Sequence, residues 1–457
     1  FGIIKFMLSI KVTNRSRELM GCKILIGLLF LTLFTYNSIP YKSDVDLVLY
    51  YWTIFLLVSS LYVFFRCKKK SNYFDFDTIF LALCSIMGFL ATNFYNESYF
   101  HLLFWGIPFD EQFINTGNLI FLLGMQTFML GSLSFSREYK KECQGRIVDP
   151  FYGCIFFLLM LLFFILSGGI TYYKSMYLGE EVGSGGVYSY MLLLCIIVVN
   201  VNTSIMFYNR RIDPDYKMSK LFYISVIIFA LLLLYIGRRS FFIFLILPFV
   251  ALYTRSYKGI SVKKFVLFAI LGIILFWVVQ NTRTGKEIET SNLNPVFLVT
   301  DLTIPSRATY SAMEYVEQNG YTYGKSMSSG LIGIIPFLSS FFDATKTYSA
   351  SVLTKFTFDS LKRDDTFGLG TTIIADIFLS WGVVGIIFFM FLLGRITAYI
   401  TCKTKTENLY YLTFYSIMVS QCAFMIRDSL FASLRLYIWA AVFVWCIKHV
   451  TFKIGRK

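Results

Sequence analysis

The chain has 457 residues, of which 56% are hydrophobic and only 15% are charged, and its mean hydropathy is +0.64. These values exclude a water-soluble globular domain and predict an integral membrane protein. The net charge of +15 is concentrated in short links between apolar segments. That pattern indicates membrane topology and contact with anionic lipid, and it does not indicate nucleic-acid binding.

Apolar segments of membrane-spanning length recur along the chain. Each approaches the ~20 residues that a helix needs to cross ~30 Å of hydrocarbon, and helices pair all the backbone amides of such segments. We therefore predict an all-α polytopic membrane protein with about twelve transmembrane helices. The predicted segments are 24–40, 45–65, 77–94, 117–136, 150–168, 187–208, 221–237, 240–254, 264–280, 372–394, 409–426 and 436–450.

Basic residues fix the predicted orientation. With the N-terminus in the cytoplasm, most Lys and Arg residues fall in alternate links on that same face, as the positive-inside rule describes. The chain then divides into helices one to nine (1–279), a large, mostly helical outer cap between helices nine and ten (280–371), and helices ten to twelve (372–457). Both termini are expected in the cytoplasm.

The cap is the longest stretch between two predicted spans, and ordered loops of this size usually carry function. None of the nine cysteines falls in it, so packing and not disulfides is expected to hold it. We predict no metal site, because His101 and His449 are the only histidines and have no further ligands at suitable spacing. No Walker-type loop is present, so no nucleotide cofactor is predicted either.

Candidate site residues stand near the predicted outer ends of the helices. His101 precedes an aromatic segment of the outer link 95–116 and is a candidate contact of the cap, although a lone interfacial histidine is more often structural. Arg238 and Arg239 form the short link between helices seven and eight, where guanidinium groups require a cavity, a partner or a bound anion. The competing interpretation is that both extend to the outer headgroups.

The cap and its entrance add two more arginines. Arg283 stands just outside helix nine. Pro305 and Gly320 predict the two ends of a helix within the cap. Arg307 on its polar face is a second candidate cap contact, or it is only paired with Glu314.

The last candidates flank helix eleven. Asp376 lies in the apolar run of helix ten, and an intramembrane carboxylate is a functional hypothesis by default. Arg427 and Arg435 are eight residues apart, so on a continuous helix they would differ by about 80° in azimuth and both would address one cavity. Asp428 is interpreted as neutralising one of them.

The clustered arginines predict a phosphate ligand, because the planar guanidinium group donates hydrogen bonds in pairs to phosphate oxygens. A membrane-embedded phosphate site that faces outward indicates a lipid pyrophosphate. The predicted pyrophosphate-binding residues are Arg238, Arg239, Arg283, Arg427 and Arg435.

Several motifs in the second half of the chain form a recognisable set. They are Gly237-Arg238-Arg239-Ser240 at a helix junction, the large outer loop, Ile334-Ile335-Pro336, the glycine, small-polar, acid, aromatic, glycine pattern of residues 368–385 around Asp376, and Arg427-Asp428. With these motifs the chain resembles the bacterial O-antigen and capsule repeat-unit polymerases, the Wzy-like proteins related to O-antigen ligases. The resemblance covers helices seven to twelve.

The resemblance implies a GT-C-like, multi-pass glycosyltransferase of the bacterial inner membrane whose active site faces the periplasm or exterior. It implies metal-independent, inverting transfer between undecaprenyl-pyrophosphate-linked oligosaccharides, with membrane lipid, a chain-length regulator and a flippase as further partners. The expected catalytic residues are Asp376, Arg239 and Arg427, with the arginines stabilising the leaving pyrophosphate and Asp376 as the base. The competing expectation is that Asp376 only orients an arginine.

Two other functions stay open on the sequence. An O-antigen ligase uses the same donor but transfers the chain to lipid A-core, and arginines do not separate the two enzymes. A transporter or flippase for lipid-linked sugars would line a path through both halves of the membrane, whereas these charges cluster at the outer end.

Overall fold

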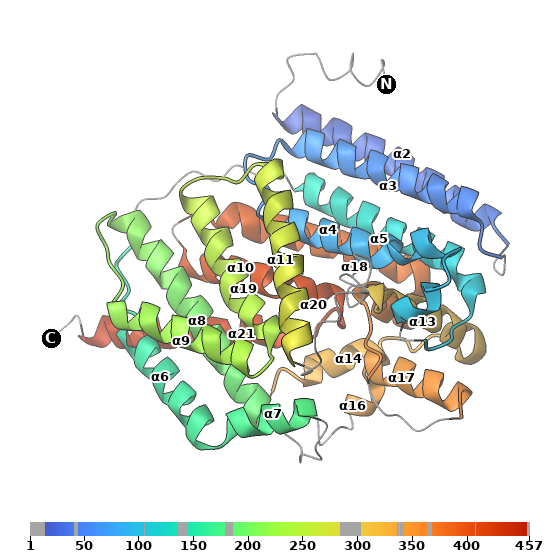
Figure 1. Ribbon diagram of the computed structural model, residues 1–457. Helices are drawn as coiled ribbons and strands as arrows, with labels where there is room; N and C mark the ends of the chain where they lie inside the picture. The colour runs from blue at the N-terminus through green and yellow to red at the C-terminus, as the bar shows by residue number, and fades with distance from the viewer. Residues whose placement is uncertain are drawn as a thin grey trace.

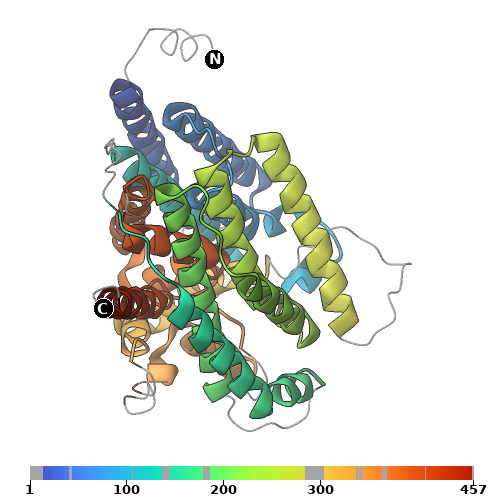
Figure 2. The same ribbon diagram turned by 90° about the vertical axis from the view of Figure 1, so that its left-hand side faces the viewer.

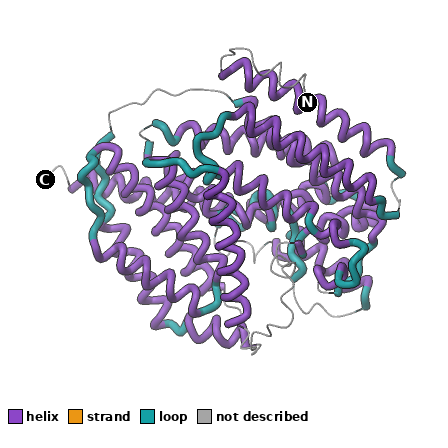
Figure 3. The backbone as a smooth tube through the Cα atoms, turned by 45° about the horizontal axis from the view of Figure 1, so that its top comes forward, coloured by secondary structure: helices purple, strands orange, loops and turns teal. Residues whose placement is uncertain are grey.

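The computed structural model consists of helices joined by turns and loops, and no strand occurs among the residues it describes (Figure 3). Those residues are 14–40, 44–104, 106–135, 145–178, 186–283, 303–335, 338, 342, 344–362, 368–406 and 408–454. The all-α class expected from the hydropathy pattern is thus confirmed.

Each of the predicted apolar segments overlaps a helix of the structure, and these helices form the bulk of the fold (Figure 1). They are α2 (Asn14–Ser38), α3 (Leu47–Lys68), α4 (Phe76–Phe89), α5 (Ile114–Ser134), α6 (Phe151–Leu166), α8 (Gly186–Ile212), α9 (Lys220–Tyr235), α10 (Arg239–Ser256), α11 (Val262–Arg283), α18 (Ile373–Lys403), α19 (Leu409–Ser420) and α21 (Leu434–Ile454).

Shorter helices fill the links between them. They are η1 (Ala91–Phe94), η2 (Phe100–Phe104), η3 (Glu111–Phe113), α7 (Gly169–Leu178), α13 (Ser306–Asn319), α14 (Lys325–Ile332), α16 (Ala344–Thr347), α17 (Ser349–Ser360) and α20 (Cys422–Ile426).

The predicted number of about twelve spans is not confirmed. Within the described residues, six helices are long and apolar enough to cross a membrane, or seven if α6 and α7, which meet at a bend of 58°, form one span. The apolar helices α9, α10 and α19 are shorter; at 1.5 Å per residue, the 12 residues of α19 extend only about 18 Å. They fall short of ~30 Å of hydrocarbon. Of these three, only α19 is clearly shorter than its predicted segment 409–426, because a break separates it from α20 (Cys422–Ile426).

The centre of the fold is the contact between α5, which is almost entirely buried, and α18, which is about half buried. A Cβ atom added at Gly131 would overlap the carbonyl of Phe391, and one added at Gly394 would overlap the carbonyl of Phe128. The two backbones thus touch without intervening side chains, which is how small residues hold helices together in membranes. This close contact fixes the C-terminal half of α18 against α5.

A break in α18 joins this helix to the segment that the sequence assigns to the cap. Gly382 has φ 63°, a left-handed conformation that interrupts the helix. The interruption frees the carbonyl of Leu379, and it accepts the backbone N–H of Thr322 at 2.9 Å. The ring of Tyr321 packs against Gly382, where a Cβ atom would lie 2.8 Å from the Tyr321 hydroxyl oxygen. The residues between α13 and α14 are therefore bonded directly to α18.

Links that the sequence assigns to one face meet at one end of the fold. At the predicted cytoplasmic end, Arg211 and Arg255 both donate hydrogen bonds to Thr404. At the other end, α13 packs against η3, α5 and α18, and Figure 1 shows α13, α14, α16 and α17 together there. Helix α11 extends through Arg283. Residues 284–302 lie outside the described part, so the boundaries of the cap stay a prediction, as does the assignment of the two ends to cytoplasm and exterior.

Candidate active site

Asp376 is held by donors from a different part of the chain. It lies in the first turn of α18, whose N-cap Thr372 accepts a hydrogen bond from the backbone N–H of Ala375 at 3.0 Å. The Asp376 side chain is fully buried. Its Oδ2 accepts hydrogen bonds from the Ser429 hydroxyl at 2.8 Å and from the Leu430 backbone N–H at 3.1 Å. This carboxylate therefore anchors the segment between α20 and α21.

Two hydroxyls from the cap region face the same carboxylate. Ser326 of α14 and Ser349 at the start of α17 lie near Asp376, although Asp376 Oδ1 and Ser349 Oγ have no hydrogen-bond partner among the described residues. Ser326 shares a hydrogen bond of 2.7 Å with Ser380 of α18. Segments far apart in sequence thus converge on one buried acid. The hydrogen bonds from Ser429 and Leu430 to Asp376 and between Ser326 and Ser380 order these segments, because each such group left unpaired in the interior would cost stability.

The anchored segment, residues 427–433, begins with the charged pair Arg427 and Asp428, and Arg435 follows it in the first turn of α21. Helix α20 ends at Ile426 and α21 begins at Leu434. The prediction that Arg427 and Arg435 share a continuous helix is therefore wrong, because turns and a bend separate them. Arg427 is exposed, whereas Arg435 is half-buried, and its Nε is buried without a hydrogen-bond partner among the described residues.

Asp428 is the acid that the sequence interpretation undervalued. It lies between the two arginines, is half-buried, and accepts the backbone N–H of Ser429 at 2.8 Å. Burial raises the pKa of Asp428 to about 6, although the Ser429 N–H and the positive charge of Arg435 act in the opposite direction. In the sequence, the signal for this role is an acid flanked by two arginines at a predicted outer link, a pattern that charge neutralisation explains equally well.

Arg238 lies at the junction of α9 and α10, where Gly237 adopts φ 75°. The Arg238 guanidinium group is 4.3 Å from the centroid of the Tyr173 ring of α7, a cation–π contact. In the second turn of α10, Phe244 packs edge-on against Phe424 of α20, with ring centroids 4.9 Å apart. The α9–α10 junction is thus connected to the helix that immediately precedes Arg427.

The other two predicted pyrophosphate ligands are located by their backbones alone. Arg239 is the first residue of α10 and Arg283 is the last residue of α11, while both side chains lie outside the described residues. Figure 2 shows α11 on the opposite flank of the bundle from α21. Arg238, Arg239, Arg427 and Arg435 therefore come from connected elements, whereas Arg283 comes from a helix on another flank.

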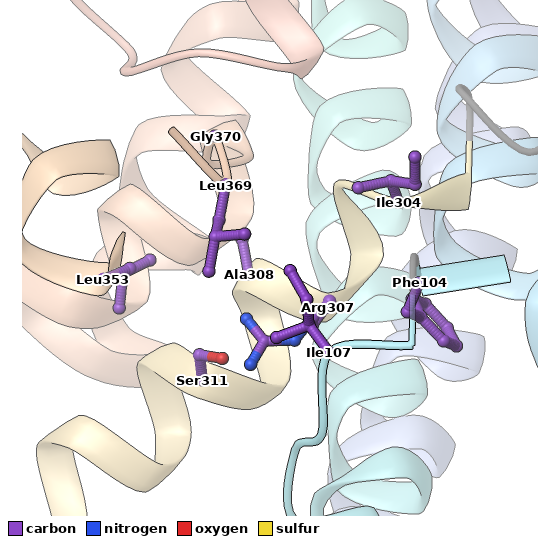
Figure 4. A pocket seen from close by; sticks show the side chains of 9 residues that line it. All are labelled: Phe104, Ile107, Ile304, Arg307, Ala308, Ser311, Leu353, Leu369 and Gly370. Carbon is purple, nitrogen blue, oxygen red and sulfur yellow. The ribbon is translucent and has the colours of Figure 1, made fainter. Parts of the chain in front are cut away.

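Arg307 joins three segments at the cap (Figure 4). It is buried, and its guanidinium group donates to the Pro108 carbonyl at 2.6 Å and to the Thr357 hydroxyl at 3.3 Å. Burial lowers the pKa of Arg307 to about 10. Glu314 interacts with it electrostatically, but no ion pair between them occurs in the described part of the chain. The adjoining cavity, lined in part by Ser311, has a volume of about 10 Å³, which is room for about one water molecule.

The class of the protein follows from comparison with known families. The family model described as O-antigen polysaccharide polymerase Wzy matches residues 22–454. The chain belongs to this Wzy family. No curated protein and no solved structure matches the chain. The suspected relationship is confirmed, and it covers the first helices as well as helices seven to twelve. The protein is accordingly a membrane protein and a glycosyltransferase-like O-antigen polymerase.

His101 is the remaining candidate cap contact of this Wzy protein. It is exposed and lies on the 95–116 link, whose Pro108 carbonyl accepts a hydrogen bond from Arg307. Its Nε2 is 3.5 Å from Oε1 of Glu111, and the Tyr95 hydroxyl donates to Oε2 of the same glutamate at 2.7 Å. These contacts place His101 at the cap end of the fold, near η3. Among the described residues, no group of three or more His, Cys, Asp and Glu side chains is arranged to hold a metal ion.

Proposed function

We propose that this Wzy-family protein polymerises O-antigen or capsule repeat units on the outer face of the bacterial inner membrane. The donor is a chain linked to undecaprenyl pyrophosphate, and the acceptor is a sugar hydroxyl of a second lipid-linked unit. The observation that carries the proposal is the segment between α20 and α21. It carries Arg427 and Asp428 and leads into α21, whose Arg435 acts electrostatically on Asp428, and Asp376 anchors it beneath the cap helices.

The proposed reaction is an inverting, metal-independent displacement at the anomeric carbon. The acceptor oxygen forms a bond to this carbon while the bond from the carbon to the pyrophosphate oxygen breaks. The bonding electron pair leaves with the pyrophosphate, and the hydroxyl proton passes to a carboxylate. Guanidinium groups stabilise the negative charge that develops on the leaving group, as a metal ion would in other enzymes.

The arginines divide into two groups in this proposal. Arg427 and Arg435 bind the pyrophosphate from the anchored segment, and Arg238 and Arg239 bind it from the α9–α10 junction. The buried, unbonded Nε of Arg435 supports its assignment, because a donor in that position is available to an anion. Arg283 is proposed as a further ligand that approaches from α11, and Arg239 and Arg427 are proposed to act on the leaving group.

The assignment of the base depends on which acid a sugar hydroxyl reaches. Asp376 is fully buried and its Oδ2 already accepts two hydrogen bonds. This environment supports the competing expectation that Asp376 is a positioning residue. Asp428 is half-buried and has a pKa near 6, close to the value that suits a general base at neutral pH. We therefore assign the base role to Asp428, with Asp376 as its rival.

Arg307 and His101 are proposed to contribute indirectly, by fixing the cap against the 95–116 link and not by contacting pyrophosphate. The cavity beside Arg307 is too small for a phosphate group. The other proposed partners are membrane lipid, a chain-length regulator and a flippase, and no nucleic acid takes part.

The test uses the full-length protein in lipid nanodiscs with a defined oligosaccharide on a lipid pyrophosphate, and gel electrophoresis of the products. We expect a ladder of polymers from the wild type and none from R427A/R435A. The control R395Q removes an exposed arginine near the opposite end of α18 and is expected to preserve the ladder. An unchanged ladder from R427A/R435A contradicts the proposal.

A test in cells separates the polymerase from its rivals. A strain that lacks this protein is expected to carry single repeat units attached to the lipid A-core. Unattached polymer would instead indicate a ligase. Purified protein that moves the lipid-linked substrate across a bilayer without extending it would indicate a transporter.

A further inference from the structure

A groove unrelated to the proposed active site lies between α3, α4 and α11, at the predicted cytoplasmic end of the fold. Its volume is about 590 Å³, within the range of sites that bind small molecules. On each helix the lining residues are spaced four apart: Leu61 and Phe65 on α3, Leu81 and Ser85 on α4, and Val262 and Val266 on α11. This spacing places each pair on one helix face, so three stripes form the walls.

One end of the groove is strongly basic. Arg66, Lys69 and Lys70 line it, and no acidic residue does. Lys70 is neutralised, because it lies 2.6 Å from Asp75 and also faces Asp77. Arg66 and Lys69 are exposed, and neither takes part in an ion pair among the residues that the structure describes. The nearby carboxylates are thus occupied by other lysines, which leaves two positive charges at the mouth of an apolar groove.

The walls of the groove are accessible from the side of the protein. Val262 is 48% exposed and Val266 is 50% exposed, although both belong to an apolar helix. An acyl chain that lies along these walls gains van der Waals contacts with them. The ligand that fits both features carries a negative headgroup on a flexible apolar chain.

We propose that this groove binds one anionic phospholipid, with its phosphate at Arg66 and Lys69 and one acyl chain against Leu61, Phe65 and Val266. The phosphate gains charge-assisted hydrogen bonds from the two cations. The bound lipid fills the space between α11 and the rest of the bundle, and so holds α11 in place. This role is independent of the reaction proposed above.

The experiment measures lipid retention by native mass spectrometry of the full-length protein, after incubation with equal amounts of phosphatidylglycerol and phosphatidylcholine. We expect the wild type to retain phosphatidylglycerol in preference. R66Q/K69Q is expected to lower this retention about tenfold. The control K217Q/K220Q removes two exposed lysines from another basic link and is expected to keep it. Equal retention of both lipids by the wild type overturns the proposal, and so does equal loss in both double variants.

A second pair of variants tests the acyl chain separately from the headgroup. V266W fills the groove without a change of charge, whereas L267W places the same bulk on an adjacent residue that does not line the groove and is 55% exposed. We expect loss of phosphatidylglycerol from V266W only. Retention that is the same in V266W and L267W would mean that the lipid adsorbs to surface charge, and it would overturn the proposal.

Discussion

Asp376 and Ser429 are joined by a hydrogen bond of 2.8 Å between residues 53 positions apart in the chain. The bond connects the first turn of α18 to the turns before α21, and the Leu430 backbone N–H strengthens the connection at 3.1 Å. Because Arg427 and Asp428 immediately precede Ser429, the geometry of these charged residues depends on a carboxylate that a substrate does not need to touch.

Substitution of Asp376 separates a positioning role from a catalytic one. D376N keeps an oxygen that accepts hydrogen bonds but cannot take up a proton as a base. We expect D376N to lower the polymerisation rate by about tenfold, which corresponds to the loss of one charge-assisted hydrogen bond. D376A, which leaves Ser429 and Leu430 without their acceptor, is expected to lower it much further. A loss of ~100-fold or more in D376N, equal to that in D376A, would identify Asp376 as the base.

The titration of Asp428 is expected to set the pH dependence of the polymerisation rate. A base must be deprotonated, so the rate is expected to fall as the pH drops through the Asp428 pKa of about 6. D428N is expected to be slow at every pH and to lose this inflection. Initial rates between pH 5 and pH 8 provide the measurement. An inflection near pH 6 that persists in D428N would assign the titration to another group.

The raised pKa of Asp428 also makes the stability of the folded protein depend on pH. Burial raises the pKa of Asp428 in the folded protein above its usual range, so its contribution to stability is present below the unfolded pKa and is lost as the pH rises through about 6. We expect wild-type protein to lose thermal stability over this range relative to D428N. A parallel pH profile for both proteins would contradict the prediction.

Arg307 is expected to stabilise the cap through its contact with Pro108 and not through Glu314. R307M removes the donor of the hydrogen bonds from the buried Arg307 side chain to Pro108 and Thr357, and we expect a loss of about 1–3 kcal/mol, measured by thermal unfolding of the full-length protein in detergent. E314Q is the matched comparison, because it removes the carboxylate and retains the arginine. An equal loss in E314Q would show that the ion pair predicted from the sequence is the important contact.

Gly394 is expected to tolerate no side chain. A Cβ atom there overlaps the Phe128 carbonyl, so G394A forces α5 and α18 apart, and we expect a loss of about 1–3 kcal/mol. Gly27 of α2 is the control, since an added Cβ atom meets nothing within 4 Å. G27A is expected to be neutral or slightly stabilising, because alanine favours the helix. Equal melting temperatures of G394A and G27A would contradict the close contact.

Membrane residence, helical class and the positions of the apolar helices could be predicted from the sequence because they depend on local properties. A helix in lipid pairs its own backbone groups, so an apolar run identifies it without knowledge of its neighbours. The family relationship was also visible in local motifs, such as the acid and glycines around Asp376 and Gly382. The predicted number of spans was not confirmed, because α9, α10 and α19 are apolar but shorter than a helix that crosses the membrane.

Only the tertiary structure decided how the charged residues are used. Whether Asp376 binds a substrate or anchors a loop depends on Ser429 and Leu430, which reach it from a distant part of the chain. Arg307 contacts Pro108, from a link some two hundred positions earlier, although Glu314 is the natural partner by helical spacing. Partners of a buried polar group are chosen by packing between helices, and helical periodicity carries information about only one helix at a time.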